Sequence, residues 1–319
     1  YTKLNCTFNT QWSASASLRA EHTYYFLDFK TFNEKITDSY TNLFPYLTVS
    51  YNSKFQSFQS SLSLGSSITR PDYELMLPAI RYSNQYSYTK GNPEQKPTIA
   101  HTLEWRNLFY QFINIFMGYE SASNLRGLVI RNSSVDPLIT EYAYHNIADY
   151  SRGYAGGNIY YKLLSDKLSG QAGGHIQHVL YKNPKNGFEF RQGKSDYWRG
   201  ILTASGNYQI TKQLGVNCYY YLYPKYNNLV YIFHTRWLMN AGAYYNSPKD
   251  NWSLSLNVHD IFNSNKTFSE LYFGDNYGRE HFHRNSRFVQ LSFIFKLRGG
   301  EKVEDKAKSG SLETDRFSK

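Results

Sequence analysis

The residues best suited to bind a ligand stand in one short stretch, RYSNQYSY at residues 81–88. Arg81 lies there within a few residues of Tyr82, Tyr86 and Tyr88. Tyr offers ring surface and a hydroxyl at low cost in conformational entropy, and Arg adds a cation, so the set could stack on a sugar or hold an anionic chelate. We predict that Arg81, Tyr82, Tyr86 and Tyr88 contact substrate. The alternative is that these rings only pack their own loop.

A second stretch, GREHFHR, resembles a metal site. His281 and His283 are two apart, so on a strand they share one face, and His259 lies on the polar face of the preceding predicted strand. Two imidazoles in this arrangement can bind a transition metal, but the sequence supplies no third ligand beside them. We interpret the pair as part of a solvated loop and predict neither a metal site nor a cofactor.

No catalytic motif accompanies these residues. The chain has no Gly-x-Ser-x-Gly, His-Glu-x-x-His or phosphate-binding glycine loop, so we predict that it is not an enzyme. Its 35 Lys and Arg exceed 25 Asp and Glu, yet they form no dense basic block, which argues against nucleic acid and leaves anionic ligands or lipopolysaccharide phosphates. Cys6 and Cys218 fall on apolar strand faces and are interpreted as inert thiols.

The elements that position these residues have a period of two. In NWSLSLNVHDIF, residues 251–262, Trp252, Leu254, Leu256 and Val258 alternate with polar residues, as in a strand with one apolar and one polar face. The apolar face must meet either a second sheet or lipid. No apolar run approaches the ~20 residues that a membrane helix needs, so a helical membrane protein is excluded.

Several features favour lipid over a second sheet. The 31 Tyr and 21 Phe exceed what a core needs and suit a membrane interface. Two predicted strands have an apolar stripe between two aromatic residues that are ten residues apart: Trp198 and Tyr208, and Trp252 and Phe262. In a strand tilted by 45°, ten residues rise about 23 Å, which is close to the height of the apolar band of a barrel. Short polar turns alternate with long connections, such as 69–98, 182–196 and 263–284, as in outer-membrane barrels. About twelve strands are predicted, near residues 11–27, 44–51, 55–67, 99–106, 109–131, 138–163, 168–181, 196–210, 214–223, 230–245, 251–262 and 284–297, with a stub at 3–9.

Four segments resemble a known family. They are SLRAEHT with Leu18, Arg19 and Glu21; the loop SITRPDYELMLP to GNPEQKP, with Arg70-Pro71 and Gly91-Asn92-Pro93; VHDIFN; and the closing strand RFVQLSFIFKL. Together they resemble the C-terminal barrel of TonB-dependent outer-membrane receptors in the form common in Bacteroidota, the outer-membrane β-barrel family. In the quoted loop, the prolines fix φ and Gly91 permits a positive φ. Leu77 followed directly by Pro78, and Gly156-Gly157-Asn158-Ile159, depart from the family pattern.

The resemblance implies an all-β fold, a transmembrane antiparallel up-and-down β-barrel, of which this chain would be the C-terminal portion with about 12 of a probable 22 strands. Residues 1–297 would form the barrel, and 298–319 a disordered, charged periplasmic tail. Long loops would be extracellular in a Gram-negative outer membrane. Because two sheet edges would be left unpaired, we expect the segment to close on itself or not to fold alone.

The implied function is import of a nutrient (a glycan, a peptide or a metal chelate) by a TonB-dependent receptor. Since the chain begins at Tyr1 without a signal segment, we expect the N-terminal plug and the TonB-contacting part to belong to a longer parent. The implied partners are outer-membrane lipid and lipopolysaccharide, the plug, the TonB complex and a surface lipoprotein. The alternatives are a non-transporting structural or adhesion barrel, and a soluble carbohydrate-binding sandwich.

Overall fold

The structure of the chain is a computed structural model. The structure describes residues 1–30, 33–55, 57–134, 136–186, 195–228, 231–273, 276–283 and 285–296. The predicted periplasmic tail, 298–319, lies outside the described residues, as does the side chain of His283.

One large antiparallel sheet dominates the fold. Its strands follow one another in chain order, each paired with the next, so that the sheet is an up-and-down meander. The strands of this path are β1 Thr2–Thr7, β2 Trp12–Phe29, β3 Glu34–Asn52, β4 Phe58–Thr69, β7 Thr98–Phe109, β8 Ile113–Asn132, β9 Thr140–Leu163, β10 Leu168–Lys182, β11 Asp196–Gln209, β12 Leu214–Tyr223, β15 Arg236–Asn246, β16 Trp252–His259 and β19 Phe288–Phe295. The stub predicted at 3–9 is β1, and the other predicted strands are found with shifted ends.

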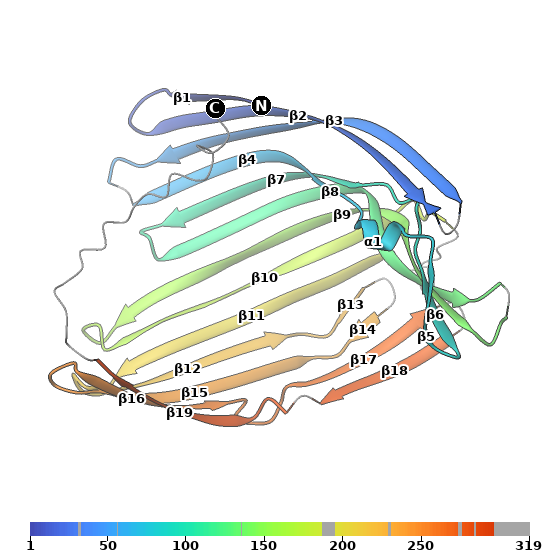
Figure 1. The fold of residues 1–319 in the computed structure, drawn as a ribbon. Coiled ribbons are helices and arrows are strands. Elements are labelled where there is room, and N and C mark those ends of the chain that lie inside the picture. Colours follow the sequence, from blue (N-terminus) through green and yellow to red (C-terminus); the bar gives the residue numbers. More distant parts are fainter. Residues whose placement is uncertain are drawn as a thin grey trace.

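Two of the long connections carry structure of their own. The segment between β4 and β7 contains the short helix α1 (Tyr73–Met76) and the hairpin of β5 (Ile80–Asn84) and β6 (Ser87–Lys90), and β6 pairs in parallel with β9. A second sheet, with the order β13-β14-β17-β18, is built from β13 (Tyr226–Asn227), β14 (Tyr231–Phe233), β17 (Lys266–Phe273) and β18 (Asn276–His283). Both structures lie at the end of the sheet opposite the short turns (Figure 1).

The predicted alternation of short and long connections is found with two exceptions, between β2 and β3 and, at residues 133–139, between β8 and β9. The turns 110–112, 164–167 and 210–213 are short, whereas 70–97 and 260–287 are long. Between β2 and β3 the expected long connection is absent, because the strands themselves are longer than predicted. β2 continues to Phe29, and β3 already begins at Glu34. These two strands therefore project beyond β4 at the end of the sheet opposite the short turns.

Two predicted strands are wrong in extent. The strand expected at 230–245 is divided between β14 and β15, because the backbone N–H of His234 donates to the carbonyl of Phe268 and so joins the second sheet. The strand expected at 251–262 ends at His259, because Asp260 adopts a left-handed φ of 47° that turns the chain. Phe262 therefore lies beyond the strand, so the predicted bracket of Trp252 and Phe262 does not measure a strand length. Trp198 and Tyr208 do flank one strand, β11.

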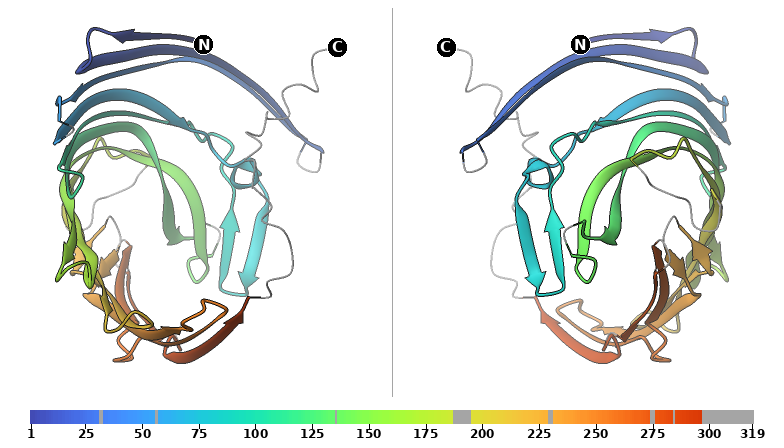
Figure 2. Two further views of the ribbon diagram at one scale, coloured as in Figure 1. Left: turned by 90° about the vertical axis from the view of Figure 1, so that its left-hand side faces the viewer. Right: turned by 90° about the vertical axis from the view of Figure 1, so that its right-hand side faces the viewer.

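The meander curls into a deep trough (Figure 2). Its edge strands, β1 and β19, do not pair with each other, so within the described residues the sheet is an open, curved sheet and not a closed ring. Of the two expected outcomes, closure of the segment on itself is not met in this structure, and failure of the segment to fold alone stays a prediction. No helix among the described residues has the length and apolar character needed to cross a membrane.

The two faces of the sheet differ in chemistry. Apolar side chains on the outer, convex face remain exposed: 58% of the surface of Trp198 is accessible, as is 53% of Leu202 and 43% of Leu256. No second layer among the described residues covers this face. A continuous exposed apolar surface of this size marks contact with lipid or another apolar partner, which favours the barrel over a sandwich.

Aromatic rings gather on the convex face beside the short turns. Trp12 packs on Tyr51 with ring centroids 4.9 Å apart, and Phe58 packs on Phe109 at the same separation. These rings come from four successive strands, β2, β3, β4 and β7, near the points where each strand meets a short turn. They are arranged as a girdle of the kind that sits at a membrane interface.

The sequence Gly173-Gly174-His175 lies in the middle of β10. A Cβ atom built on Gly173 would lie 2.5 Å from the carbonyl oxygen of Gly157 on β9. Glycine is needed there for close approach of the strands.

Candidate functional site

The concave wall carries a charged network across five strands. Glu104 on β7 accepts from Arg106 Nη2 at 2.9 Å through Oε1 and from the Tyr154 hydroxyl of β9 at 2.9 Å through Oε2. Arg106 also lies over the ring of Phe116 on β8, 5.5 Å from its centroid. The carboxylate of Glu104 is thus compensated by a cation and a phenol of its own wall.

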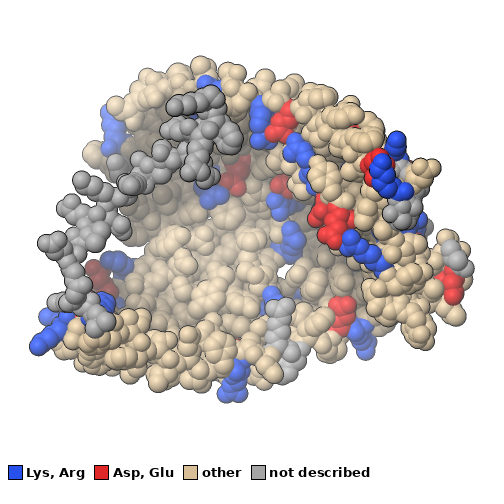
Figure 3. Space-filling model, viewed as in Figure 1, with Lys and Arg blue, Asp and Glu red and all other residues tan. Residues whose placement is uncertain are grey.

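The same arrangement recurs one strand along. Glu120 on β8 accepts from Arg152 Nη2 at 2.9 Å and from the Tyr150 hydroxyl. Gln177 on β10 continues the chain of contacts, because its Oε1 accepts from Arg152 at 3.4 Å and from Arg199 on β11 at 3.3 Å. Figure 3 shows charges of both signs on the concave wall. A polar wall opposite an apolar convex face is the pattern of a water-filled or plugged lumen.

The structure places the four predicted binding residues on one hairpin, β5–β6. Tyr82 and Tyr86 are exposed, with 65% and 63% of their surfaces accessible, and Arg81 pairs with Glu74 of α1 at 2.5 Å. Tyr88 differs, because only 6% of its surface is accessible. The hairpin therefore presents Arg81, Tyr82 and Tyr86 outward and uses Tyr88 as an anchor.

Tyr88 anchors the hairpin to the end of β9. Its hydroxyl lies 2.7 Å from Glu141 Oε2 and 3.0 Å from Ser133 Oγ. Glu141 is itself buried and is paired with Arg131, whose Nε donates to it at 2.8 Å. The ring of Tyr82 meets that of Tyr88 edge-on at 5.6 Å, so the exposed ring is held in place by the buried one.

The Gly91-Asn92-Pro93 segment fastens the same loop to β9. Asn92 Nδ2 donates to the carbonyl of Tyr144 at 3.2 Å, and its backbone N–H donates to the carbonyl of Leu75 at 2.8 Å. The side chain of Asn146 accepts from Lys96 N and donates to Lys96 O. These contacts explain why the loop needs amides at those positions.

The expected role of Gly91 is corrected by this geometry. Its φ does not lie in the left-handed region; a Cβ built on it would instead stand 1.8 Å from the carbonyl oxygen of Leu77. Gly91 is required for close approach of two backbone segments, and not for a positive φ.

Histidines do not assemble into a metal site among the described residues. His281 pairs across the β17–β18 hairpin with Phe268, whose ring lies 4.4 Å from the imidazole and 4.2 Å from that of His234. His259 stacks on Phe288 at 4.2 Å. The described residues contain no group of three His, Cys, Asp or Glu with metal-binding geometry.

Sequence reasoning missed the role of Asp260, the acidic residue of VHDIFN. Asp260 is fully buried, and its oxygens accept from Ser264 N at 2.8 Å, Asn265 N at 3.1 Å and Ser286 Oγ at 2.7 Å. Burial disfavours the charge, but these hydrogen bonds outweigh it and lower the pKa of Asp260 below its ordinary value. The signal available was Asp followed by Asn and Ser in a turn, a pattern typical of side-chain capping of loop N–H groups.

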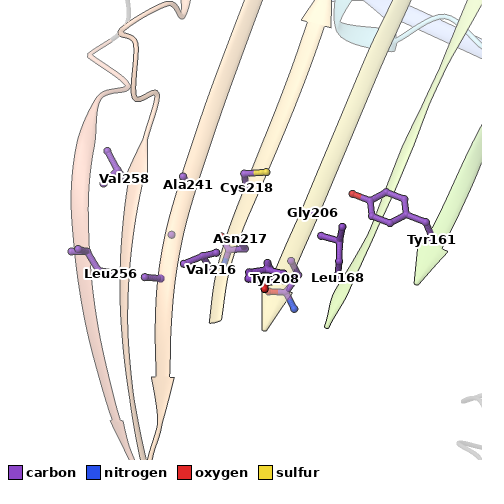
Figure 4. A pocket seen from close by; sticks show the side chains of 13 residues that line it. Tyr161, Leu168, Gly206, Tyr208, Val216, Asn217, Cys218, Ala241, Leu256 and Val258 are labelled. Atoms are coloured by element: carbon purple, nitrogen blue, oxygen red, sulfur yellow. The ribbon is translucent and has the colours of Figure 1, made fainter. Parts of the chain in front are cut away.

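A shallow apolar hollow of about 560 Å³ lies on the convex face (Figure 4). Small residues form its floor, among them Gly206, the free thiol Cys218 and Ala241, and Tyr161 and Tyr208 stand beside them. Because this hollow belongs to the face with exposed apolar residues and small residues form its floor, it is a place for hydrocarbon.

Four features define the class of protein as an outer-membrane β-barrel. They are the antiparallel meander, the apolar convex face, the aromatic girdle and the charged concave wall. The model of the Outer membrane protein beta-barrel family matches residues 1–295, and the chain belongs to that family.

Solved structures share this fold at low sequence identity. The copper transporter OprC aligns with 92% of this chain and 46% of its own length, with a TM-score of 0.59 and 12% identity. The F5-1 variant of the FrpB iron transporter from Neisseria meningitidis aligns with 90% of this chain and 44% of its own length, with a TM-score of 0.57 and 13% identity. The siderophore receptor PirA from Pseudomonas aeruginosa aligns with 89% of this chain and 49% of its own length, with a TM-score of 0.53 and 13% identity.

The chain therefore spans about half the length of these structures, with values between 44% and 49%. No curated protein matches the sequence significantly.

Proposed function

We propose that the chain forms the C-terminal part of the barrel of a TonB-dependent receptor that imports a nutrient across the outer membrane. The observation that carries the proposal is the pairing of an exposed apolar convex face with a charged, hydrogen-bonded concave wall in a member of the outer-membrane β-barrel family. A path for polar solutes needs a wall of this kind.

In this proposal a plug domain lies against the concave wall and the TonB complex drives uptake. The short turns face the periplasm, and the β5–β6 hairpin and the second sheet face the exterior with the lipopolysaccharide. Arg81, Tyr82 and Tyr86 contact the nutrient at the outer mouth, whereas Tyr88 holds their hairpin. The nutrient is a glycan, a peptide or a metal chelate, and a surface lipoprotein delivers it.

Fractionation of cells that make the protein tests the location first. The protein should be recovered in the outer membrane and give a folded band that shifts on boiling. Recovery as a soluble protein with no such shift would show that the convex face meets another protein layer, and the barrel assignment would be wrong.

Uptake tests the activity. A deletion strain should grow poorly on one class of nutrient (glycan, peptide or chelated metal), and loss of TonB should reproduce that defect. Normal growth of the deletion strain on all three classes, with the protein correctly placed in the outer membrane, would favour a structural or adhesion barrel.

A further inference from the structure

The concave face of β12 carries a run of tyrosines that leads towards the second sheet. Tyr219 and Tyr221 pair with Ser205 and Thr203 of β11, on the same face as Arg199, and so point to the concave side. The ring of Tyr221 lies 6.2 Å from that of Tyr219 and 5.4 Å from that of Tyr223. Three aromatic rings thus follow one another along the strand from its middle to its end.

The second sheet carries a further group of stacked rings, which follows the first group along the chain. Tyr226 of β13 follows three residues after Tyr223, and its ring stacks on Phe233 of β14 at 4.8 Å. Phe233 also stacks on Tyr231 at 5.3 Å, and β13 lies against β11. We call this set the aromatic ladder; it consists of Tyr219, Tyr221, Tyr223, Tyr226, Phe233 and Tyr231.

The hydroxyls of the ladder are free. Within the described part of the chain, none of its five tyrosines forms a side-chain hydrogen bond. By contrast, the hydroxyls of Tyr150, Tyr154 and Tyr244, which face the same lumen, donate to Glu120, Glu104 and Gln209. The lumen therefore holds two kinds of tyrosine: those that brace the wall, and those of the ladder, which keep a donor and an acceptor for a ligand.

Free amides lie beside the ladder. Asn207, Asn217 and Asn257 lie on β11, β12 and β16, on the concave face, and among the described residues their side chains form no hydrogen bond. A Cβ on Gly242 would lie 2.3 Å from Asn257 Oδ1 and 3.0 Å from Asn217 Oδ1, so the two amides converge over this glycine. We call these three residues the amide row.

Ring faces, free phenols and free amides are the neutral groups that recognise a sugar. The apolar face of a pyranose stacks on an aromatic ring, and its hydroxyls exchange hydrogen bonds with amides and phenols. An anionic chelate would instead need several cations. The cations Arg236 and Arg199 near the ladder are already engaged. Arg236 lies over the ring of Tyr223, 5.0 Å from its centroid, and Arg199 donates to Gln177 Oε1 at 3.3 Å.

We infer that the aromatic ladder and the amide row form an extended saccharide-binding track on the concave wall. The inference rests on the proposed function and deepens it, because it names the glycan as the substrate class. A chain of sugar rings passes from ring to ring along the ladder, and the amide row holds its hydroxyls near the middle of the barrel.

Binding to outer-membrane fractions tests the track without requiring uptake. The probes are three labelled linear hexasaccharides: maltohexaose, cellohexaose and β-1,4-mannohexaose. At least one should bind saturably to membranes that contain the protein and not to membranes of a strain that lacks it. Tyr221→Ala should weaken this binding about tenfold or more, and Asn217→Leu should weaken it as well.

Two variants control for damage to the fold. Tyr221→Trp keeps a ring and should retain binding. Tyr220→Ala changes the adjacent residue, whose ring packs on Trp237 on the convex face, and should leave binding unchanged. Each variant must give the heat-modifiable band of the wild type.

Two results would overturn the inference. The first is that none of the three saccharides binds, because stacking on aromatic rings depends on the pyranose shape that all three share. The second is that binding remains intact in both Tyr221→Ala and Tyr223→Ala. Binding that is present without any TonB-dependent uptake would contradict the proposed function and leave the track standing. TonB-dependent uptake of a peptide or metal chelate, with no saccharide binding, would contradict the track alone.

Discussion

The hydroxyl of Tyr88 donates a hydrogen bond of 2.7 Å to Oε2 of Glu141, and this bond joins residues 53 positions apart in the chain. It places the β5–β6 hairpin, which carries Arg81, Tyr82 and Tyr86, beside the projecting end of β9. The position of the predicted binding residues thus depends on one buried phenol and one buried carboxylate.

Removing this phenol should loosen the hairpin. Tyr88→Phe leaves Glu141 with one donor fewer in a buried site, which costs about 1–3 kcal/mol of local stability. Amide hydrogen exchange over residues 80–90 should become faster, whereas Tyr82→Phe, at an exposed ring, should leave exchange unchanged. Equal exchange in Tyr88→Phe and the wild type would show that the parallel pairing of β6 with β9 holds the hairpin by itself.

The ion pair of Glu120 and Arg152 should stabilise the concave wall. The side chain of Glu120 is only 12% exposed. Arg152→Met therefore leaves the Glu120 carboxylate mostly buried, with the Tyr150 hydroxyl as its main partner. We expect a loss of about 2–3 kcal/mol, seen as a lower temperature for loss of the heat-modifiable band.

The pair of Glu104 and Arg106 is a matched control on the neighbouring strand. Arg106 is 51% exposed, so Arg106→Met should cost less than half as much. A double variant, Glu120→Gln with Arg152→Met, should recover part of the loss by removing the stranded charge. If the double variant were no more stable than Arg152→Met, the loss of stability would come from the missing packing of Arg152 over the ring of Tyr154.

Gly91→Ala should disrupt the loop between β4 and β7. The new methyl group would stand 1.8 Å from the carbonyl oxygen of Leu77, which forces two backbone segments apart and should cost more than about 2 kcal/mol. Limited proteolysis should then cut within residues 70–97. Gly153→Ala is the control, because a Cβ at Gly153 meets nothing within 4 Å, and it should leave the wild-type resistance intact.

The contribution of Asp260 to stability should depend on pH. Its pKa is lowered in the folded protein, so the stabilisation is present above the unfolded pKa of about 3.9 and is lost as the pH falls through the folded pKa. The difference in unfolding temperature between the wild type and Asp260→Asn should be full at pH 5–7 and shrink below about pH 3.9. A difference that stays constant from pH 7 down to pH 2 would mean that folding does not lower the pKa of this carboxyl group.

Asp166→Asn provides the comparison for the pH experiment. Asp166 is 72% exposed, and its partner Lys162 lies 3.6 Å away. A surface pair of this kind contributes little, so its removal should not change the pH dependence.

The sequence alone determined the class of fold. A period of two, with Trp252, Leu254 and Leu256 on one face, defines strands, because neighbouring side chains in a strand point to opposite sides. The regular return of short polar turns predicted the meander, and the meander was found. The sequence also singled out Arg81, Tyr82 and Tyr86, which the β5–β6 hairpin exposes, together with Tyr88, which it buries.

Only the tertiary structure decided what those residues touch. Tyr82, Tyr86 and Tyr88 look alike in sequence, yet the pairing of β6 with β9 buries Tyr88 and leaves the other two exposed. The end of β16 was set by the left-handed turn at Asp260, whose carboxylate is held by Ser286, and no local pattern reveals a partner 26 residues away. The aromatic ladder likewise needs strand register and the stacking of β13 on β14, because periodicity gives the face of a residue but not its neighbours across strands.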